Sequence, residues 1–96
     1  MSFMPELRKF LLDNTRIYTV RKYKMGLATV EVSGVGLCKR IPQGMTYKED
    51  LEPFVSDSGF STLEDWWAKI RHFVPDKTDP LYLYRIELLG EEDGDL

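Results

Sequence analysis

The segment from residue 15 to residue 23, TRIYTVRKY, combines side chains that bind phosphate with side chains that stack on nucleobases. Arg16, Arg21 and Lys22 lie in it, and Lys24 follows directly. An arginine guanidinium can bind a phosphate through two parallel hydrogen bonds, and a tyrosine ring offers a stacking surface. The segment is therefore either the floor of a binding site or an ordinary edge strand with charged residues toward solvent.

Period-two alternation divides this segment into two faces. One face carries Ile17, Thr19, Arg21 and Tyr23, and the other carries Arg16, Tyr18, Val20 and Lys22. Arg21 is the first candidate for a ligand contact, with Thr19 as a hydrogen-bonding group and Tyr23 as the stacking ring. The alternatives are an ion pair of Arg21 with Glu31 or Glu87, and a tyrosine that belongs to the core.

Charge is distributed unevenly along the 96 residues, whose net charge is −3. Residues 1–48 contain nine Lys or Arg against three Asp or Glu, and residues 49–96 contain four against thirteen. Such segregation predicts a basic face on an acidic protein unless folding scatters the charges. The cations that would form a basic rim are Lys22, Lys24, Lys39 and Arg40. They fit equally well as solvated residues that protect a sheet edge.

The sequence has few signals for a cofactor, a metal site, a disulfide or a membrane segment. No P-loop, dinucleotide or zinc pattern is present, so no cofactor is expected. His72 has no Cys or His at metal-binding spacing, which favours a surface position near a helix end. Cys38 is the single cysteine, so a reducing, cytoplasmic location is expected. No apolar run of about 18 residues and no signal-peptide pattern is seen, so no membrane partner is predicted.

Helices and strands that could position these residues follow from apolar periodicity and turn residues. Helices are predicted over Pro5–Leu12 and from a Ser61–Glu64 capping box to Phe73 or Val74. The second helix carries Trp66 and Trp67, one of which should be central to the core. Strands are predicted over Arg16–Tyr23, Leu27–Ser33 and Leu81–Leu89, with Val35–Ile41 continuing the second strand.

The remaining segments are turns and a tail. Pro42–Gly44 is predicted to be a turn, and Tyr47–Val55 could hold one helical turn before Pro53. The order of elements indicates a single α+β domain over residues 1–89. Residues 90–96 form an acidic segment that is expected to be mobile.

Three short motifs occur in one order along most of the chain. They are Thr19-Val20-Arg21, Gly59-Phe60-Ser61 before Trp66-Trp67, and a strand after Val74-Pro75 that reads Tyr82-Leu83-Tyr84-Arg85-Ile86-Glu87. In this order they resemble the ASCH family, over residues 7–89. The resemblance implies a small PUA-like β-barrel with flanking helices, which binds RNA in a cleft between strands and helix.

Some bacterial members of that family hydrolyse acetylated cytidine, and the resemblance implies three catalytic positions. Thr19 matches the nucleophile, Arg16 replaces a lysine, and Ser58, beside Asp57, replaces a glutamate. Arginine stays protonated and cannot act as a general base, whereas a threonine nucleophile needs one. The connection over residues 22–27 is also shorter than in the family, which predicts an incomplete barrel unless a partner or residues 35–41 supply a strand.

Three functional hypotheses follow. The first is an RNA-binding module with no cofactor, whose interface comprises Arg16, Thr19, Arg21, Lys22, Tyr23, Lys24, Lys39 and Arg40. The second is an amidohydrolase that acts on a modified nucleoside through Thr19. The third is a protein-interaction domain, such as a homodimer that completes the barrel.

Overall fold

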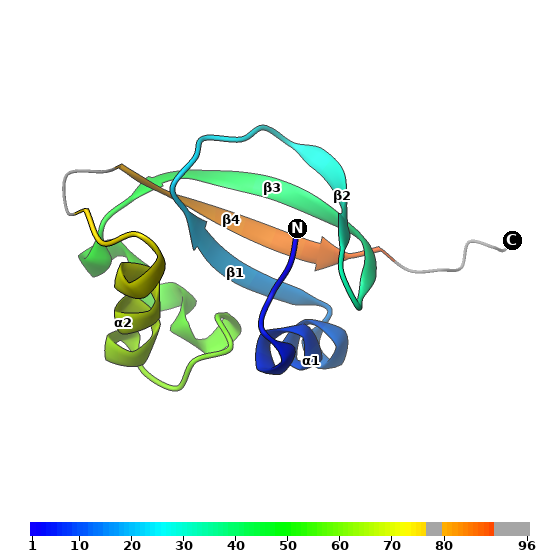
Figure 1. Ribbon diagram of the computed structural model, residues 1–96, viewed down its shortest axis with the longest axis horizontal. Helices are drawn as coiled ribbons and strands as arrows, with labels where there is room; N and C mark the ends of the chain where they lie inside the picture. The colour runs from blue at the N-terminus through cyan, green and yellow to red at the C-terminus, as the bar shows by residue number, and fades with distance from the viewer. Residues whose placement is uncertain (77–79, 90–96) are drawn as a thin grey trace, which may run out of the picture.

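The computed structural model describes residues 1–76 and 80–89 and contains a four-stranded antiparallel sheet with three helices against it (Figure 1). The strand order is β1-β4-β3-β2. The predicted α+β class is confirmed, and the acidic segment 90–96 lies outside the described residues. The elements are α1 (Pro5–Asn14), β1 (Arg16–Arg21), β2 (Ala28–Val32), β3 (Gly36–Thr46), η1 (Lys48–Asp57), α2 (Leu63–Phe73) and β4 (Leu81–Leu88).

The sheet is open rather than closed into a barrel. β1 and β2 are its outer strands, and no pairing joins them within residues 1–76 and 80–89. Residues 36–41 belong to β3, an antiparallel strand between β2 and β4, so the segment 35–41 neither continues β2, as predicted, nor supplies a closing strand. The described strands therefore form an open sheet and not a closed barrel, and one edge of β1 is left without a neighbouring strand.

β3 runs through the predicted turn at Pro42–Gly44 as a bulged strand, so that prediction is wrong. The Leu37 carbonyl accepts a hydrogen bond from the Leu89 amide, so odd-numbered β3 residues direct their backbone groups toward β4. Pro42 therefore directs its nitrogen toward the opposite edge, which β2 does not cover, because the first residue of β2, Ala28, pairs with Arg40. The missing N–H costs no ladder bond there, and a strand edge tolerates the proline.

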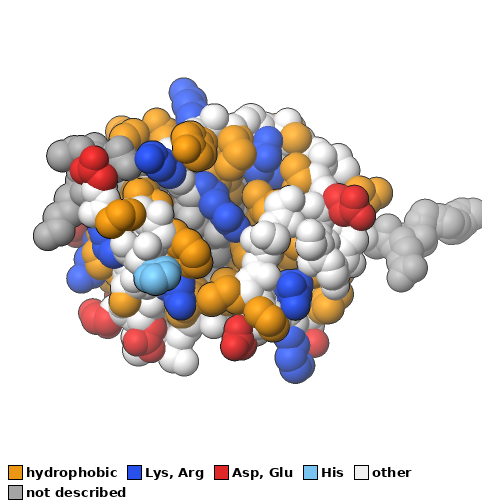
Figure 2. Space-filling view, in the orientation of Figure 1, with side chains coloured by type: hydrophobic (Ala, Val, Ile, Leu, Met, Phe, Trp, Pro, Cys, Tyr) orange, Lys and Arg blue, Asp and Glu red, His pale blue; other side chains and the backbone are white. Residues whose placement is uncertain are grey.

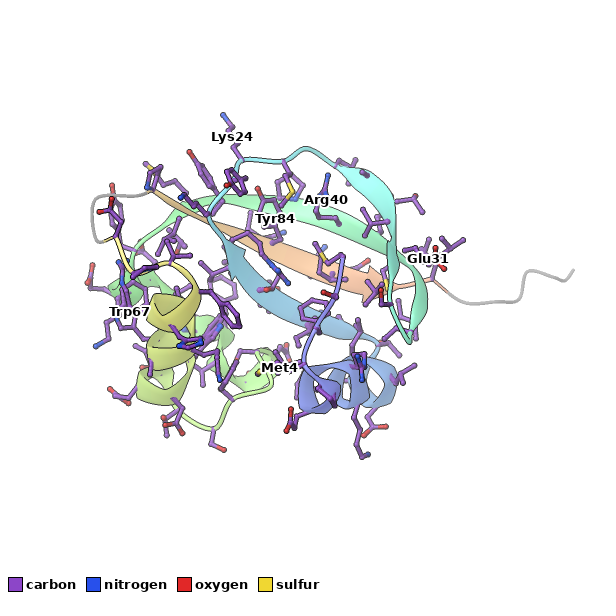
Figure 3. All side chains as sticks on the ribbon, viewed as in Figure 1. Met4, Lys24, Glu31, Arg40, Trp67 and Tyr84 are labelled. Atoms are coloured by element: carbon purple, nitrogen blue, oxygen red, sulfur yellow. The ribbon has the colours of Figure 1, made fainter. Side chains whose placement is uncertain are left out.

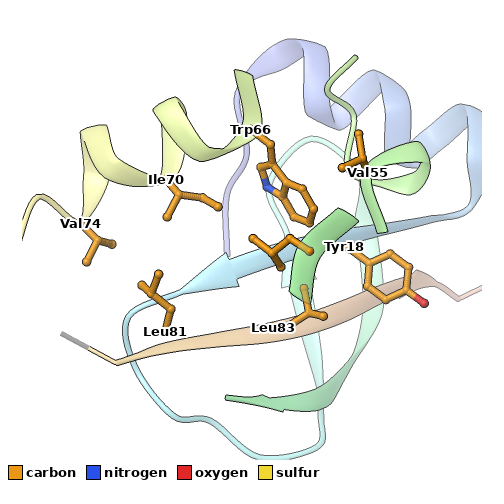
Figure 4. Close-up of a cluster of buried hydrophobic side chains, with 8 residues drawn as sticks. Tyr18, Val55, Trp66, Ile70, Val74, Leu81 and Leu83 are labelled. Carbon is orange, nitrogen blue, oxygen red and sulfur yellow. The ribbon is translucent and has the colours of Figure 1, made fainter. Parts of the chain in front are cut away.

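Hydrophobic side chains cover both faces of the sheet. On one face, η1 and α2 pack over β1 and β4 around Trp66, Tyr18 and Leu83 (Figure 4). On the other face, α1 packs over Ile17 and Ile86. Trp66 is buried and Trp67 is only partly buried, in agreement with the prediction that one tryptophan is central to the core.

The helices differ from the predictions in their details. α2 begins after Thr62, whose Oγ1 accepts a hydrogen bond from the Asp65 amide at 3.1 Å. The predicted Ser61–Glu64 capping box is therefore wrong by one residue. η1 is a 3₁₀ helix that continues through Pro53, beyond the single turn expected there. No helix in the described part of the chain is long and apolar enough to cross a membrane.

Candidate functional site

A cavity of about 780 Å³ lies along the free edge of β1. Tyr18 and Val20 point to one face of the sheet, Thr19 and Arg21 point to the other, and all four line the cavity. Most of the remaining lining comes from residues 1–4, from the β1–β2 loop (residues 22–27) and from α2, and the rest comes from Leu7, Val30, Arg40, Ser58 and Phe60. Small-molecule sites typically have volumes of roughly 300–1,000 Å³, so this cavity is large enough for a nucleotide-sized ligand.

Arg21 is the half-buried cation of the cavity. Its Nε is buried without a hydrogen-bond partner among the described residues, and its Cζ lies 5.1 Å from the centroid of the Phe3 ring. Burial lowers the pKa of Arg21, because water no longer solvates the charge fully. The alternative ion pair with Glu87 is not formed, since Glu87 pairs with Arg85. An anion in the cavity could therefore satisfy a donor that the protein leaves unpaired.

Further cations line the same cavity from three different elements. Arg40 extends from β3, and its Nε donates to the Gly26 carbonyl at 3.1 Å. Lys69 extends from α2, and Lys22 lies at the start of the β1–β2 loop. No Asp or Glu is among the described residues that line the cavity. Figure 2 shows Lys and Arg side chains among hydrophobic ones on this face of the molecule. The site is thus locally basic, although the net charge of the chain is −3.

The Tyr84 hydroxyl fixes the loop that forms one wall of the cavity. It accepts a hydrogen bond from the Met25 amide at 2.6 Å and donates to the Tyr23 carbonyl at 2.7 Å. Tyr84 is itself only 1% exposed, so its ring is held by the core (Figure 3). β1 ends at Arg21 rather than at Tyr23, and Tyr23 is 69% exposed on the loop. Its ring is therefore available at the rim of the cavity rather than on the strand face with Arg21.

The structure brings five of the eight predicted interface residues to the cavity: Thr19, Arg21, Lys22, Tyr23 and Arg40. The other three lie elsewhere. Arg16 pairs with Asp57 at 3.2 Å. Lys39 points to the opposite face of β3 from Arg40 because the two are adjacent in the strand. Lys24 points outward from the β1–β2 loop (Figure 3).

Aromatic side chains of the cavity were missed by the sequence interpretation, together with Lys69. Trp66, Lys69 and Phe73 line the cavity from α2, at spacings of three and four residues that place them on one helix face. This spacing was the available signal. Phe3 lines the cavity from the segment before α1, and no periodic pattern in the sequence connects it to β1.

Phe60 reaches the cavity through a turn that is fixed by a buried serine. The Ser58 hydroxyl donates to the Val55 carbonyl at 2.7 Å and accepts from the Phe60 amide at 3.1 Å. Gly59 has φ +87°, and a Cβ at this position would lie 2.5 Å from the Leu7 side chain. The left-handed backbone therefore favours glycine here, and any other residue would also displace the Leu7 side chain of α1.

The arrangement is suited to binding an anion that is attached to a flat ring. The cations can bind phosphate, and the aromatic side chains offer surfaces on which a base can stack. Thr19 also lines the cavity and is 9% exposed. No group of three or more potential metal ligands occurs in residues 1–76 and 80–89.

No protein-family model, no curated protein and no solved structure matches this chain. The resemblance to the ASCH family therefore stays a prediction, and the functional argument rests on the cavity itself.

Proposed function

We propose that this protein binds single-stranded RNA in the cavity along the free edge of β1. The observation that carries the proposal is Arg21, a half-buried cation with an unpartnered Nε at the cavity. Buried charges in proteins are normally paired, so an unpaired one beside an open cavity favours an anionic ligand. The proposal includes a PUA-like origin for the fold, in which the open edge of β1 corresponds to the cleft of an incomplete barrel.

Single-stranded RNA fits the cavity better than duplex RNA does. Proteins recognise unpaired bases by stacking them on aromatic side chains and by binding their exposed edges, whereas duplex RNA is read mainly across its surface. Phe60 and Phe73 supply accessible rings in the cavity, and each stacked base is worth about 1–3 kcal/mol. The rings lie within the same concavity as Arg21, so a base and its phosphate could be held together.

The test is a fluorescence-anisotropy titration with single-stranded and hairpin RNA pools at two salt concentrations. Arg21→Gln should weaken binding about tenfold, as expected when a charge-assisted hydrogen bond of roughly 1.5–3 kcal/mol is lost. Affinity should also fall with salt, by a log–log slope of about −0.7 for each phosphate neutralised on a single strand.

Arg16→Gln is the matched control, because it removes the same charge from the same strand outside the cavity. It should leave the affinity nearly unchanged. Equal losses in the two variants would mean that RNA responds to overall charge and not to the cavity. Circular dichroism of both variants shows whether the fold is retained.

An amidohydrolase remains the second candidate, because Thr19 lines the cavity. The described lining contains no carboxylate and no histidine that could act as the general base, and Arg16 lies outside the cavity. Incubation with acetylated cytidine, with Thr19→Val as the control, tests this function directly. Release of cytidine by the wild-type protein but not by Thr19→Val would establish it.

A further inference from the structure

We infer that the cavity is selective for a terminal phosphate monoester, either at the end of an RNA strand or on a free nucleotide. This inference rests on the proposed function and specifies which chemical group of the ligand Arg21 receives. It predicts that a phosphorylated chain end binds more tightly than the same strand without that phosphate.

The positive charge of the cavity favours a phosphate monoester over an internal phosphodiester. Arg21, Arg40 and Lys69 line it, and no carboxylate is among its described lining residues. An internal phosphodiester brings one negative charge, whereas a phosphate monoester brings about 1.5 to 2 at neutral pH because its second pKa is about 6. Several cations in a partly desolvated cavity therefore favour the more highly charged group.

The half-buried position of Arg21 also favours a terminal phosphate. Its Nε is buried and unpartnered, and the Phe3 ring lies against the guanidinium. A terminal phosphate has three oxygens without further substituents, and such a group can approach a recessed guanidinium bidentately. An internal phosphate has two such oxygens and carries the chain on both sides, so its approach to a recessed group is more restricted.

The walls of the cavity favour a chain end over a strand that continues through the cavity. Residues 1–4 are held against the sheet, since the Ser33 amide donates to the Met1 carbonyl at 3.0 Å. An Arg8 side-chain N–H also donates to the Phe3 carbonyl, at 3.4 Å. α2 and the β1–β2 loop also line the cavity, so it is bordered by several segments in addition to β1. A chain end needs a single opening into such a space, whereas a continuing strand needs both an entrance and an exit.

The experiment compares one single-stranded RNA sequence with a 5′-phosphate, with a 3′-phosphate and with hydroxyls at both ends. Nucleoside 5′-monophosphate and the unphosphorylated nucleoside form a second pair, measured by calorimetry. One phosphorylated end should bind about tenfold more tightly than the hydroxyl form, as expected for a bidentate charge-assisted contact. Arg21→Gln should abolish this difference, and Arg16→Gln should preserve it.

A pH series separates the monoester from other anions. Lowering the pH from about 7.5 to about 5.5 protonates the monoester, so the advantage of the phosphorylated RNA should shrink several-fold. Internal phosphodiesters keep their charge over this range, so the hydroxyl form controls for changes in the protein. The charged and titratable groups of the residues that line the cavity with Arg21 are the side chains of Tyr18, Lys22, Tyr23, Arg40 and Lys69 and the Met1 amino group. An advantage that does not change with pH would count against a monoester site.

The outcomes separate this inference from the proposed function. Equal affinity for the phosphorylated and hydroxyl forms would overturn the inference and leave RNA binding in place. Binding of the free monophosphate without binding of RNA would overturn the proposed function and support the monoester site. No binding of any probe at tens of micromolar would overturn both. If Arg21→Gln does not fold, Lys69→Gln should reduce the advantage of the phosphorylated form, and an undiminished advantage in that variant would overturn the inference.

Discussion

Tyr84 connects the core of the protein to its candidate site through a single side chain. Its ring lies in the cluster beneath α1, while its hydroxyl binds two backbone groups of the β1–β2 loop. The loop carries Tyr23, whose exposed ring lies at the rim of the cavity. The position of the rim is therefore determined by a hydroxyl that makes no contribution to apolar packing.

Tyr84→Phe should lower the free energy of unfolding by about 1–3 kcal/mol, because it leaves the Met25 amide without its partner. Urea unfolding measures this loss, and amide hydrogen exchange at Met25 should become faster. Tyr82→Phe removes a hydroxyl from the same strand face and should change stability by less than about 0.5 kcal/mol. Comparable losses in both variants would contradict the proposed role of the Tyr84 hydroxyl.

At the scale of elements, the start of α2 is determined by a choice between two neighbouring caps. Ser61 with Glu64 and Thr62 with Asp65 have the same three-residue spacing, and each pair satisfies the capping pattern. The Thr62 hydroxyl accepts the Asp65 amide, so α2 begins one residue later than predicted. Packing of Trp66 and Ile70 on the sheet sets the rotation of the helix and with it the cap.

Thr62→Ala should destabilise the protein by about 1 kcal/mol, as is typical for loss of a helix N-cap. Ser61→Ala should have an effect within about 0.5 kcal/mol, since Ser61 is exposed and does not cap the helix. The free energy of unfolding in urea distinguishes the two. The opposite order of effects would restore Ser61 as the cap.

The sequence predicted elements with strong local signals and missed features that depend on tertiary contacts. α2 was predicted because its apolar residues recur at helical spacing, and β1 because it alternates. The strand through Pro42 was missed, because the proline is tolerable there only since β2 does not extend past Arg40 along β3. Arg21 was predicted from its residue type, whereas Lys69 was missed because the approach of α2 to the edge of β1 has no local signature.

At the scale of the whole molecule, the two hydrophobic clusters share the same strands. β1 contributes Tyr18 to the cluster beneath α2 and Ile17 to the cluster beneath α1. β4 contributes Leu83 to the first and Ile86 to the second. Neither cluster can lose its packing without loosening strands that the other needs, so the described part of the chain should unfold as one unit. A homodimer stays a prediction.

Ile86→Val should lower the free energy of unfolding by about 0.5–1.5 kcal/mol. Both tryptophans lie in α2, with the other cluster, yet their fluorescence should report the same shift in urea midpoint as far-ultraviolet circular dichroism. Leu12→Ala, on the exposed side of α1, should shift neither signal by more than about 0.5 kcal/mol. Separate midpoints for the two signals would show that the clusters unfold independently.

The cavity is basic, whereas the chain as a whole has a net charge of −3. This contrast between local and overall charge affects the rate at which a ligand is captured. At physiological ionic strength, charges separated by more than about 8 Å are largely screened from one another. A polyanion that approaches in dilute salt senses the whole, repulsive charge of the protein before it reaches the cavity. Electrostatic steering should therefore contribute little to the rate of encounter, and added salt should weaken binding mainly by shortening the residence time of a bound strand.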